Sequence, residues 1–175
     1  MKSAKEIIIP AVYVATLIGA QFVLSGVAGV ELVTVLLLSF VYAFGLKKGL
    51  IVANAFIVLR TLLFGFFINI FILYIVYYNV FVIVIGVISK IFKSKYSVKI
   101  HVLLTVLAVV LTACFTLFDD VLTPLMYSYS LSATKIYFIA SLYTMVPQLI
   151  CSLATVTTLF YPLYKVLIIF SKNNN

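Results

Sequence analysis

Charge is the scarcest property of this sequence, and its scarcity narrows the class of protein at once. Only 9% of the 175 residues are charged, just four of them acidic, whereas 66% are hydrophobic. Soluble globular domains carry about 25% charged residues. The composition therefore excludes an ordinary soluble domain and predicts a protein whose main solvent is lipid.

Several chemical motifs are missing as well. None of the seven glycines begins a phosphate-binding loop of the form G-x-x-x-x-G-K-[S/T], so the chain cannot hydrolyse ATP by that route. His101 is the sole histidine, which excludes multi-histidine metal sites. No two acids lie deep within separate helices, as a membrane aspartyl protease needs. We therefore expect no enzyme, no metal site and no cofactor.

The two cysteines and the net charge of +8 add little chemistry. Cys114 and Cys151 lie inside apolar runs without metal-ligand spacing, which predicts buried, reduced thiols. The basic residues lie at the margins of apolar runs and form no stripe among aromatic residues. This arrangement argues against a nucleic-acid partner.

Apolar runs fill most of the chain and predict a single all-α membrane domain over residues 1–175. A helix needs roughly 20 apolar residues to cross a bilayer core about 30 Å thick. The runs predict six transmembrane helices, near residues 7–25, 31–45, 49–67, 70–89, 100–118 and 143–170.

Three of these segments depart from the pattern of a simple transmembrane helix. The first resembles a signal peptide but is too long, so we expect a retained helix. The second is short and could be tilted, extended or packed inside the bundle. The sixth carries Pro147 and Pro162, which predict kinks. The stretch 120–142 is left as the longest outer connection, and it could form a lid.

The lysines predict the orientation, because basic loops tend to stay in the cytoplasm. With six alternating helices, ten of the eleven lysines fall on one side, and only Lys135 falls on the other. Glu31, Asp119 and Asp120 fall on the lysine-poor side, whereas Glu6 falls on the basic side. This pattern predicts that both termini are cytoplasmic.

Polar residues of separate helices then reach a similar depth near the outer face. We predict that they form a substrate-binding cluster, whose candidates are Gln21, Glu31, Arg60, Asn69, Asp119, Tyr143 and Gln148. Arg60, the only arginine, could grip an anionic group of a substrate through two parallel hydrogen bonds. Alternatively, it could form an internal ion pair with Glu31, Asp119 or Asp120.

The other candidates could have structural roles that involve no ligand. Asp119, Asp120 and Glu31 could simply be solvated at helix ends, and adjacent acids on a helix point in different directions. Six outer tyrosines are typical of an interfacial belt, although a few could stack on a flat ring. They are Tyr74, Tyr77, Tyr78, Tyr127, Tyr129 and Tyr143.

Small residues in the first helix suggest a contact surface. Ala11, Ala15 and Gly19 recur every four residues along one stripe. Such spacing lets another helix approach closely in lipid. The stripe could be ordinary packing within the bundle, or a docking surface if it faces outward.

The chain resembles the substrate-binding S component of an energy-coupling factor (ECF) transporter, a prokaryotic uptake system for vitamins. The resemblance covers nearly the whole chain and includes the Ala11–Ala15 repeat, the run Val30–Thr34, and the run Leu59–Gly65 before an aromatic-rich helix. It implies a vitamin-like ligand bound at the outer face, and a docking stripe that meets a membrane coupling protein driven by two cytoplasmic ATPases. It also implies a multi-pass protein of a prokaryotic cell membrane. Several family pockets use tryptophan, which this chain lacks.

Two other classes compete with this interpretation. One is a non-transporting membrane scaffold or assembly subunit, whose polar outer residues only meet water or a partner. The other is a small membrane-embedded transferase, which would need a cluster of acids and metal ligands that the sequence does not display.

Overall fold

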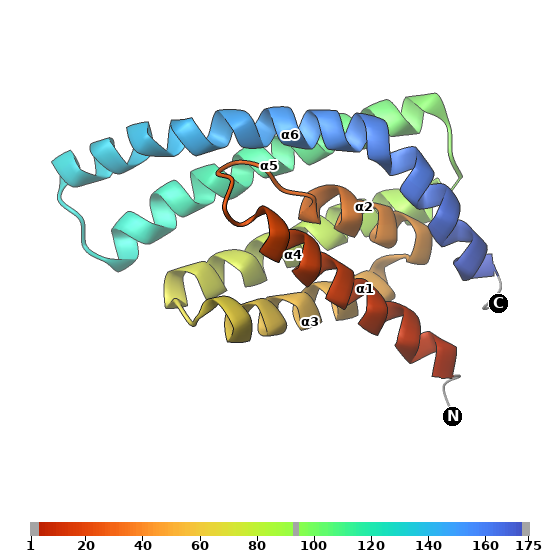
Figure 1. The fold of residues 1–175 in the computed structure, drawn as a ribbon. Helices are drawn as coiled ribbons and strands as arrows, with labels where there is room; N and C mark the ends of the chain where they lie inside the picture. Colours follow the sequence, from red (N-terminus) through yellow and green to blue (C-terminus); the bar gives the residue numbers. More distant parts are fainter. Residues whose placement is uncertain (1–3, 93–94, 173–175) are drawn as a thin grey trace.

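The computed structural model describes residues 4–92 and 95–172, and within these ranges the regular structure is entirely α-helical. This confirms the predicted all-α class with six helices (Figure 1). Side chains are described for residues 7–92 and 95–171. The helices are α1 (Ala4–Leu24), α2 (Val33–Phe44), α3 (Leu46–Phe64), α4 (Ile68–Ile91), α5 (Val98–Met126) and α6 (Leu131–Lys172).

The short helix α2 forms the centre of the bundle. Each of its residues from Val33 to Ala43 is buried, as expected for a helix that is apolar on every side. Side-chain hydrogen bonds fix it to its neighbours, since Tyr13 donates to the Leu36 carbonyl at 2.7 Å and Tyr42 donates to the Lys95 carbonyl at 2.6 Å. Of the three arrangements considered for this segment, burial inside the bundle is the one that forms.

The outer surface of the bundle is apolar, which identifies the protein as membrane-embedded. Four helices are long and apolar enough to cross a bilayer, namely 7–24 in α1, α4, α5 and 131–171 in α6. Large aliphatic side chains project from them, such as Val23 at 78% exposure and Leu125 at 75%. Such a surface is stable only in contact with lipid or with a partner protein.

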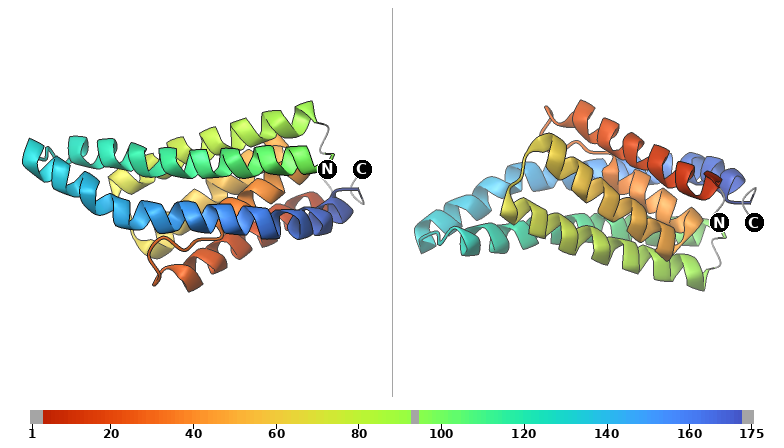
Figure 2. Two further views of the ribbon diagram at one scale, coloured as in Figure 1. Left: turned by 90° about the horizontal axis from the view of Figure 1, so that it is seen from above. Right: turned by 90° about the horizontal axis from the view of Figure 1, so that it is seen from below.

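The predicted outer connection over residues 120–142 is wrong. Helix α5 continues to Met126 and α6 begins at Leu131, so no long lid lies between them. Hydrogen bonds join the two helices in this region: Tyr137 donates to Asp119 at 2.8 Å and Ser141 donates to Asp120 at 2.7 Å. This α5–α6 pair projects beyond the other helices (Figure 2).

Helix α6 is much longer than a bilayer is thick. Its 42 residues span about 63 Å at about 1.5 Å per residue, against a hydrocarbon core of about 30 Å. It bends in its C-terminal part (Figure 1), which contains Pro162. A proline inside a helix removes one backbone hydrogen bond and clashes with the preceding turn, so the predicted kink has a local cause.

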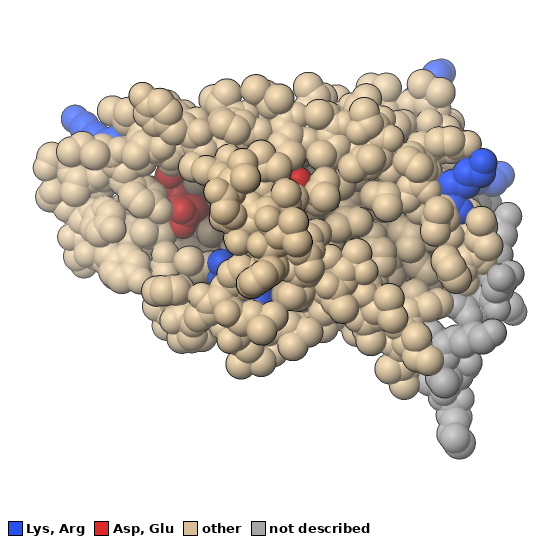
Figure 3. All heavy atoms as spheres, viewed as in Figure 1, with Lys and Arg blue, Asp and Glu red and all other residues tan. Residues whose placement is uncertain are grey.

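The two ends of the bundle differ in charge. The start of α1, the end of α6, the α2–α3 turn and the α4–α5 connection lie at one end (Figure 2). In Figure 3, basic atoms lie at that end, further basic atoms lie at the opposite end and near the middle of the face, and acidic atoms lie in hollows of the surface shown. This arrangement matches the predicted even number of helices. Lys2 and Lys93, which entered the orientation argument, lie outside the described residues.

Candidate functional site

Three neighbouring cavities that share lining residues lie toward the end of the bundle opposite the basic one. The arginine cavity, about 380 Å³, lies between α1, α3 and the α1–α2 connection. The middle cavity, about 70 Å³, shares Gln21 and Glu31 with it. The aspartate cavity, about 300 Å³, lies between α5 and α6 and shares Phe115 and Gln148 with the middle cavity. Ligand pockets in proteins usually measure about 300–1,000 Å³.

Arg60 is held in the arginine cavity by aromatic rings. Its guanidinium carbon lies 4.5 Å from the centre of the Tyr74 ring and 5.6 Å from that of Phe64, within range of cation–π attraction. Its Nε is buried and has no hydrogen-bond partner. Within the described part of the chain, no carboxylate lies within 4.0 Å of the guanidinium, so the alternative of an internal ion pair does not form.

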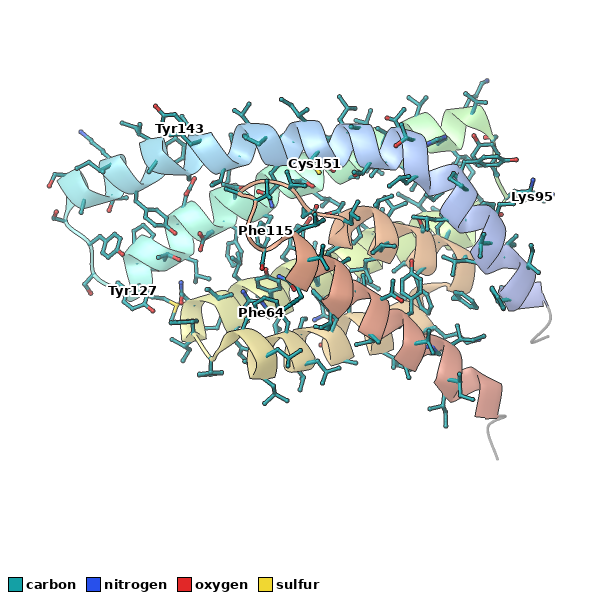
Figure 4. The ribbon with its side chains drawn as sticks, in the orientation of Figure 1. Phe64, Lys95, Phe115, Tyr127, Tyr143 and Cys151 are labelled. Carbon is teal, nitrogen blue, oxygen red and sulfur yellow. The ribbon has the colours of Figure 1, made fainter. Side chains whose placement is uncertain are left out.

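The middle cavity is walled by aromatic rings and amide groups. Gln21 donates through Nε2 to the Tyr74 hydroxyl at 3.3 Å, whereas its Oε1 is buried without a partner. Phe115 points into the bundle from α5 (Figure 4), and its ring centre lies 4.7 Å from that of Tyr77. Tyr78 also lines this cavity. An interfacial belt is therefore wrong for Tyr74, Tyr77 and Tyr78.

Glu31 lies in the α1–α2 connection, between the first two cavities. Its carboxylate accepts a hydrogen bond from the backbone N–H of Thr34 at 3.0 Å, in the first turn of α2, where the helix dipole favours negative charge. Burial acts in the opposite direction and raises the pKa of Glu31 above its ordinary value. Glu31 is thus a partly satisfied acid that faces two cavities.

The α1–α2 connection is held against α6 by hydrogen bonds and close packing. The backbone N–H of Glu31 donates to the Cys151 sulfur at 3.4 Å, and the Cys151 thiol donates to the Glu31 carbonyl at 3.3 Å. Cys151 lies beside this connection in Figure 4. Gly29 has φ of +76°, and a Cβ there would lie 2.7 Å from Pro147 Cβ. The connection therefore covers the arginine cavity in a fixed position.

Asp119 is the charged residue that lines the aspartate cavity. Its two carboxylate oxygens accept hydrogen bonds from the hydroxyls of Thr123 at 2.6 Å and Tyr137 at 2.8 Å. Gln148 reaches the same cavity and accepts a hydrogen bond from Thr116 at 3.3 Å. Asp120 lines a different hollow, as expected because adjacent residues on a helix point in different directions.

Two predicted members of the cluster do not line these cavities. Asn69 is buried beside Asp119, where it donates to Thr123 at 3.1 Å and accepts from Tyr127 at 3.2 Å. Asn69 therefore bonds to Thr123, the residue that donates to Asp119, without lining the aspartate cavity itself. Tyr143 is 82% exposed and points away from the bundle (Figure 4). The structure thus brings together Gln21, Glu31, Arg60, Asp119 and Gln148.

Sequence reasoning missed several residues that line the cavities, chiefly Thr112, Phe115, Tyr137 and Ser141. A signal for part of this lining was present in α5. Four of its threonines recur at spacings of seven, four and seven residues and are all buried, namely Thr105, Thr112, Thr116 and Thr123. A polar stripe with helical periodicity on an apolar helix indicates a face turned toward protein rather than lipid.

The small-residue stripe of α1 faces outward. Ala11, Ala15 and Gly19 are exposed, and no atom lies within 4 Å of a Cβ built on Gly19. Ala11 also borders an apolar groove of about 530 Å³ between α1 and α3. Of the two alternatives for the stripe, packing inside the bundle is therefore wrong.

The cysteines are both free. Cys151 is half-buried against the α1–α2 connection, but Cys114 is exposed on the outer surface of α5. Burial was therefore predicted wrongly for Cys114, because an apolar run in a membrane helix can face lipid as readily as core.

Fold and site together define a class: an all-helical, membrane-embedded protein with a polar chamber toward one end of its bundle. Comparison with family models, curated proteins and solved structures finds no match to this chain. Its function is therefore inferred from its own geometry.

Proposed function

We propose that this chain is the substrate-binding S component of an ECF-type importer, which captures a vitamin-like nutrient at the outer face of a prokaryotic cell membrane. The observation that carries the proposal is Arg60, which has no carboxylate partner among the described residues, keeps a buried Nε without a hydrogen bond, and lines the first of three neighbouring cavities. Gln21 adds a second buried atom without a partner. Unsatisfied buried polar groups each cost about 1–3 kcal/mol, and more when charged. A bound ligand that pairs with them offsets this cost.

A binding subunit of this kind needs an external source of energy and a surface through which it receives that energy. The sequence contains no phosphate-binding loop, and the outward stripe of Ala11, Ala15 and Gly19 offers a smooth contact for another helix. In our proposal this stripe meets the membrane coupling protein, whose two cytoplasmic ATPases power release of the ligand to the inside.

Mass spectrometry of small molecules that co-purify with the detergent-solubilised protein tests this function. We expect a compound that is enriched with the wild-type chain and reduced at least tenfold with Arg60→Ala. Lys135→Gln, which removes an exposed charge outside the three cavities, serves as the control and should retain the compound. If wild type and Arg60→Ala yield the same small molecules, the binding role is wrong.

A membrane scaffold or assembly subunit is the alternative, and the exposed stripe of α1 is the observation that favours it. A scaffold would use the same stripe to hold a partner and would need no ligand. An empty wild-type protein that still binds a membrane partner through Ala15 would identify this second function.

A further inference from the structure

The three cavities have an order that restricts what can occupy them. The arginine and middle cavities share Gln21 and Glu31 as lining residues, and the middle and aspartate cavities share Phe115 and Gln148. The shared residues place the three cavities in a row, from Arg60 past an aromatic wall to Asp119, and this row is called the path below. A ligand that fills the path has one end at each of these two residues.

The two ends carry opposite charges, and among the residues that the structure describes neither has a counter-ion. The Arg60 guanidinium lies against the rings of Tyr74 and Phe64, both neutral residues. Within the same described ranges, Asp119 accepts hydrogen bonds from the neutral hydroxyls of Thr123 and Tyr137. A carboxylate offers about four lone-pair positions, so Asp119 keeps capacity for further donors. Lys135, the basic residue of the same helix pair, is exposed and within 4.0 Å of neither acid of α5.

Unpaired charges inside a membrane protein are costly. An ionised side chain inside a bilayer raises the free energy by roughly 3 kcal/mol or more unless it pairs or meets water. A ligand with a single charge would offset the cost of the unpaired charge at only one end of the path. A ligand with charges of both signs offsets this cost at both ends, because each of its groups meets the opposite charge in the protein.

We propose that the ligand is zwitterionic, with an anionic group that pairs with Arg60 and an ammonium-like group that pairs with Asp119. This inference rests on the proposed binding function and specifies its substrate class. The body that joins the two groups is narrow, because the middle cavity measures about 70 Å³ against about 380 Å³ and 300 Å³ for the cavities on either side. A slender aliphatic body suits the walls formed by Tyr74, Tyr77 and Phe115.

Glu31 does not replace Asp119 as the partner of the cation. It lies at the junction of the first two cavities, on the Arg60 side of the narrow part. One of its carboxylate oxygens is already occupied by the Thr34 backbone N–H. A cation beside Glu31 would lie near the guanidinium of Arg60, where like charges repel, whereas Asp119 lies at the far end of the path.

The test uses the small-molecule extract of the purified protein itself. The extract is passed over a cation-exchange resin at acidic pH, where a carboxylate is protonated, and over an anion-exchange resin at basic pH, where an ammonium group is neutral, and compounds enriched with wild type are scored on each. We expect such a compound to carry both an anionic and an ammonium group, shown by its fragment masses and by retention on each resin at a suitable pH. A compound with charges of one sign only, or with none, would overturn the inference while leaving the binding function intact.

Paired variants locate each end of the compound. Arg60→Gln and Asp119→Asn should each lower its recovery at least tenfold, whereas the matched control Asp120→Asn, one residue further on, should leave recovery unchanged. Should Arg60→Gln fail to fold, Arg60→Lys keeps the charge without the planar fork and should lower recovery less than tenfold. Loss with only one of the two charge variants would contradict a two-ended ligand. If no compound is enriched with wild type, the proposed function itself is wrong, and the inference falls with it.

Discussion

Glu31 combines a structural contact with a position in the lining of two cavities. Its carboxylate caps the first turn of α2 through Thr34, yet burial raises its pKa. The folded chain therefore holds a proton on Glu31 more tightly than the unfolded chain does. By linkage, this group stabilises the fold most at a pH below its ordinary pKa, and that stabilisation is lost as the pH rises through the raised pKa.

We therefore predict that Glu31→Gln, without added ligand, unfolds at a higher temperature than wild type at pH 8. Glutamine keeps an acceptor for the Thr34 N–H but carries no charge to desolvate. The gap should narrow as the pH falls and vanish below about 4.5, the ordinary value. Thermal unfolding in detergent between pH 4 and 8 measures it, with Lys135→Gln as a control that should show no such trend. A constant gap across this range would contradict the prediction.

Asn54 shows how a polar residue is tolerated away from the chamber. It donates to the Asn79 side chain at 3.0 Å and receives a bond in return at 3.3 Å, while each amide also donates to the carbonyl four residues earlier. All four amide N–H groups are thus satisfied between α3 and α4. Interhelical bonds of this kind contribute about 0.6–2 kcal/mol in membranes, so this pair is structural.

At the scale of elements, the α1–α2 connection is the segment whose position depends on one glycine. Gly29 has a positive φ and lies against Pro147 and the backbone of α6. Both features exclude a side chain, because a Cβ would be strained by the backbone angle and would clash with α6. The cover over the arginine cavity thus depends on close contact between two backbones.

We predict that Gly29→Ala destabilises the fold by about 1–3 kcal/mol. The unfolding temperature should fall by several degrees, at about 2–4 °C per kcal/mol for a chain of this size. Gly26→Ala is the matched control, because no atom lies within 4 Å of a Cβ there. Equal unfolding temperatures for the two variants would show that the connection is not held as described.

Helix α1 has a second function in the proposal, as the contact with the coupling protein. Ala15→Leu places a large side chain on the outward stripe, so we expect uptake by cells to fall at least fivefold while ligand binding to the isolated chain is unchanged. Val12→Leu changes a large side chain that is already 62% exposed beside the stripe and should leave uptake intact. Transport and binding assays on the same variants measure both effects, and normal uptake with Ala15→Leu would argue against docking there.

At the scale of the whole molecule, charge divides the bundle into two ends. The described lysines at the end where α1 begins predict that this end is cytoplasmic, which places the chamber toward the cell exterior. The proposed function requires that placement, because a chamber that captures a nutrient has to open to the side from which the nutrient arrives.

Labelling of single cysteines tests the orientation. In a chain without Cys114 and Cys151, Lys47→Cys and Ser130→Cys lie at opposite ends of the bundle. A membrane-impermeant thiol reagent should label Ser130→Cys in intact cells and Lys47→Cys only after the cells are opened. Labelling of both from outside, or of Lys47→Cys alone, would reverse or refute the orientation.

The helical class, the membrane environment and the even number of helices can be predicted from the amino-acid sequence. These properties follow from the length of apolar runs and from the positions of lysines, which are local features of the chain. The sequence also placed Gln21, Glu31, Arg60, Asp119 and Gln148 at a common level, because depth along a helix follows from residue number.

Only the tertiary structure decided which way each side chain points and where α5 and α6 end. In lipid, both the core face and the outer face of a helix are apolar, so the pattern of residues gives little information on rotation about the axis. For this reason the sequence predicts Tyr143 as a member of the cluster and does not predict Tyr77 as one. The ends of α5 and α6 depend on hydrogen bonds between the two helices, such as that of Ser141 with Asp120, and those bonds exist only once the chain has folded.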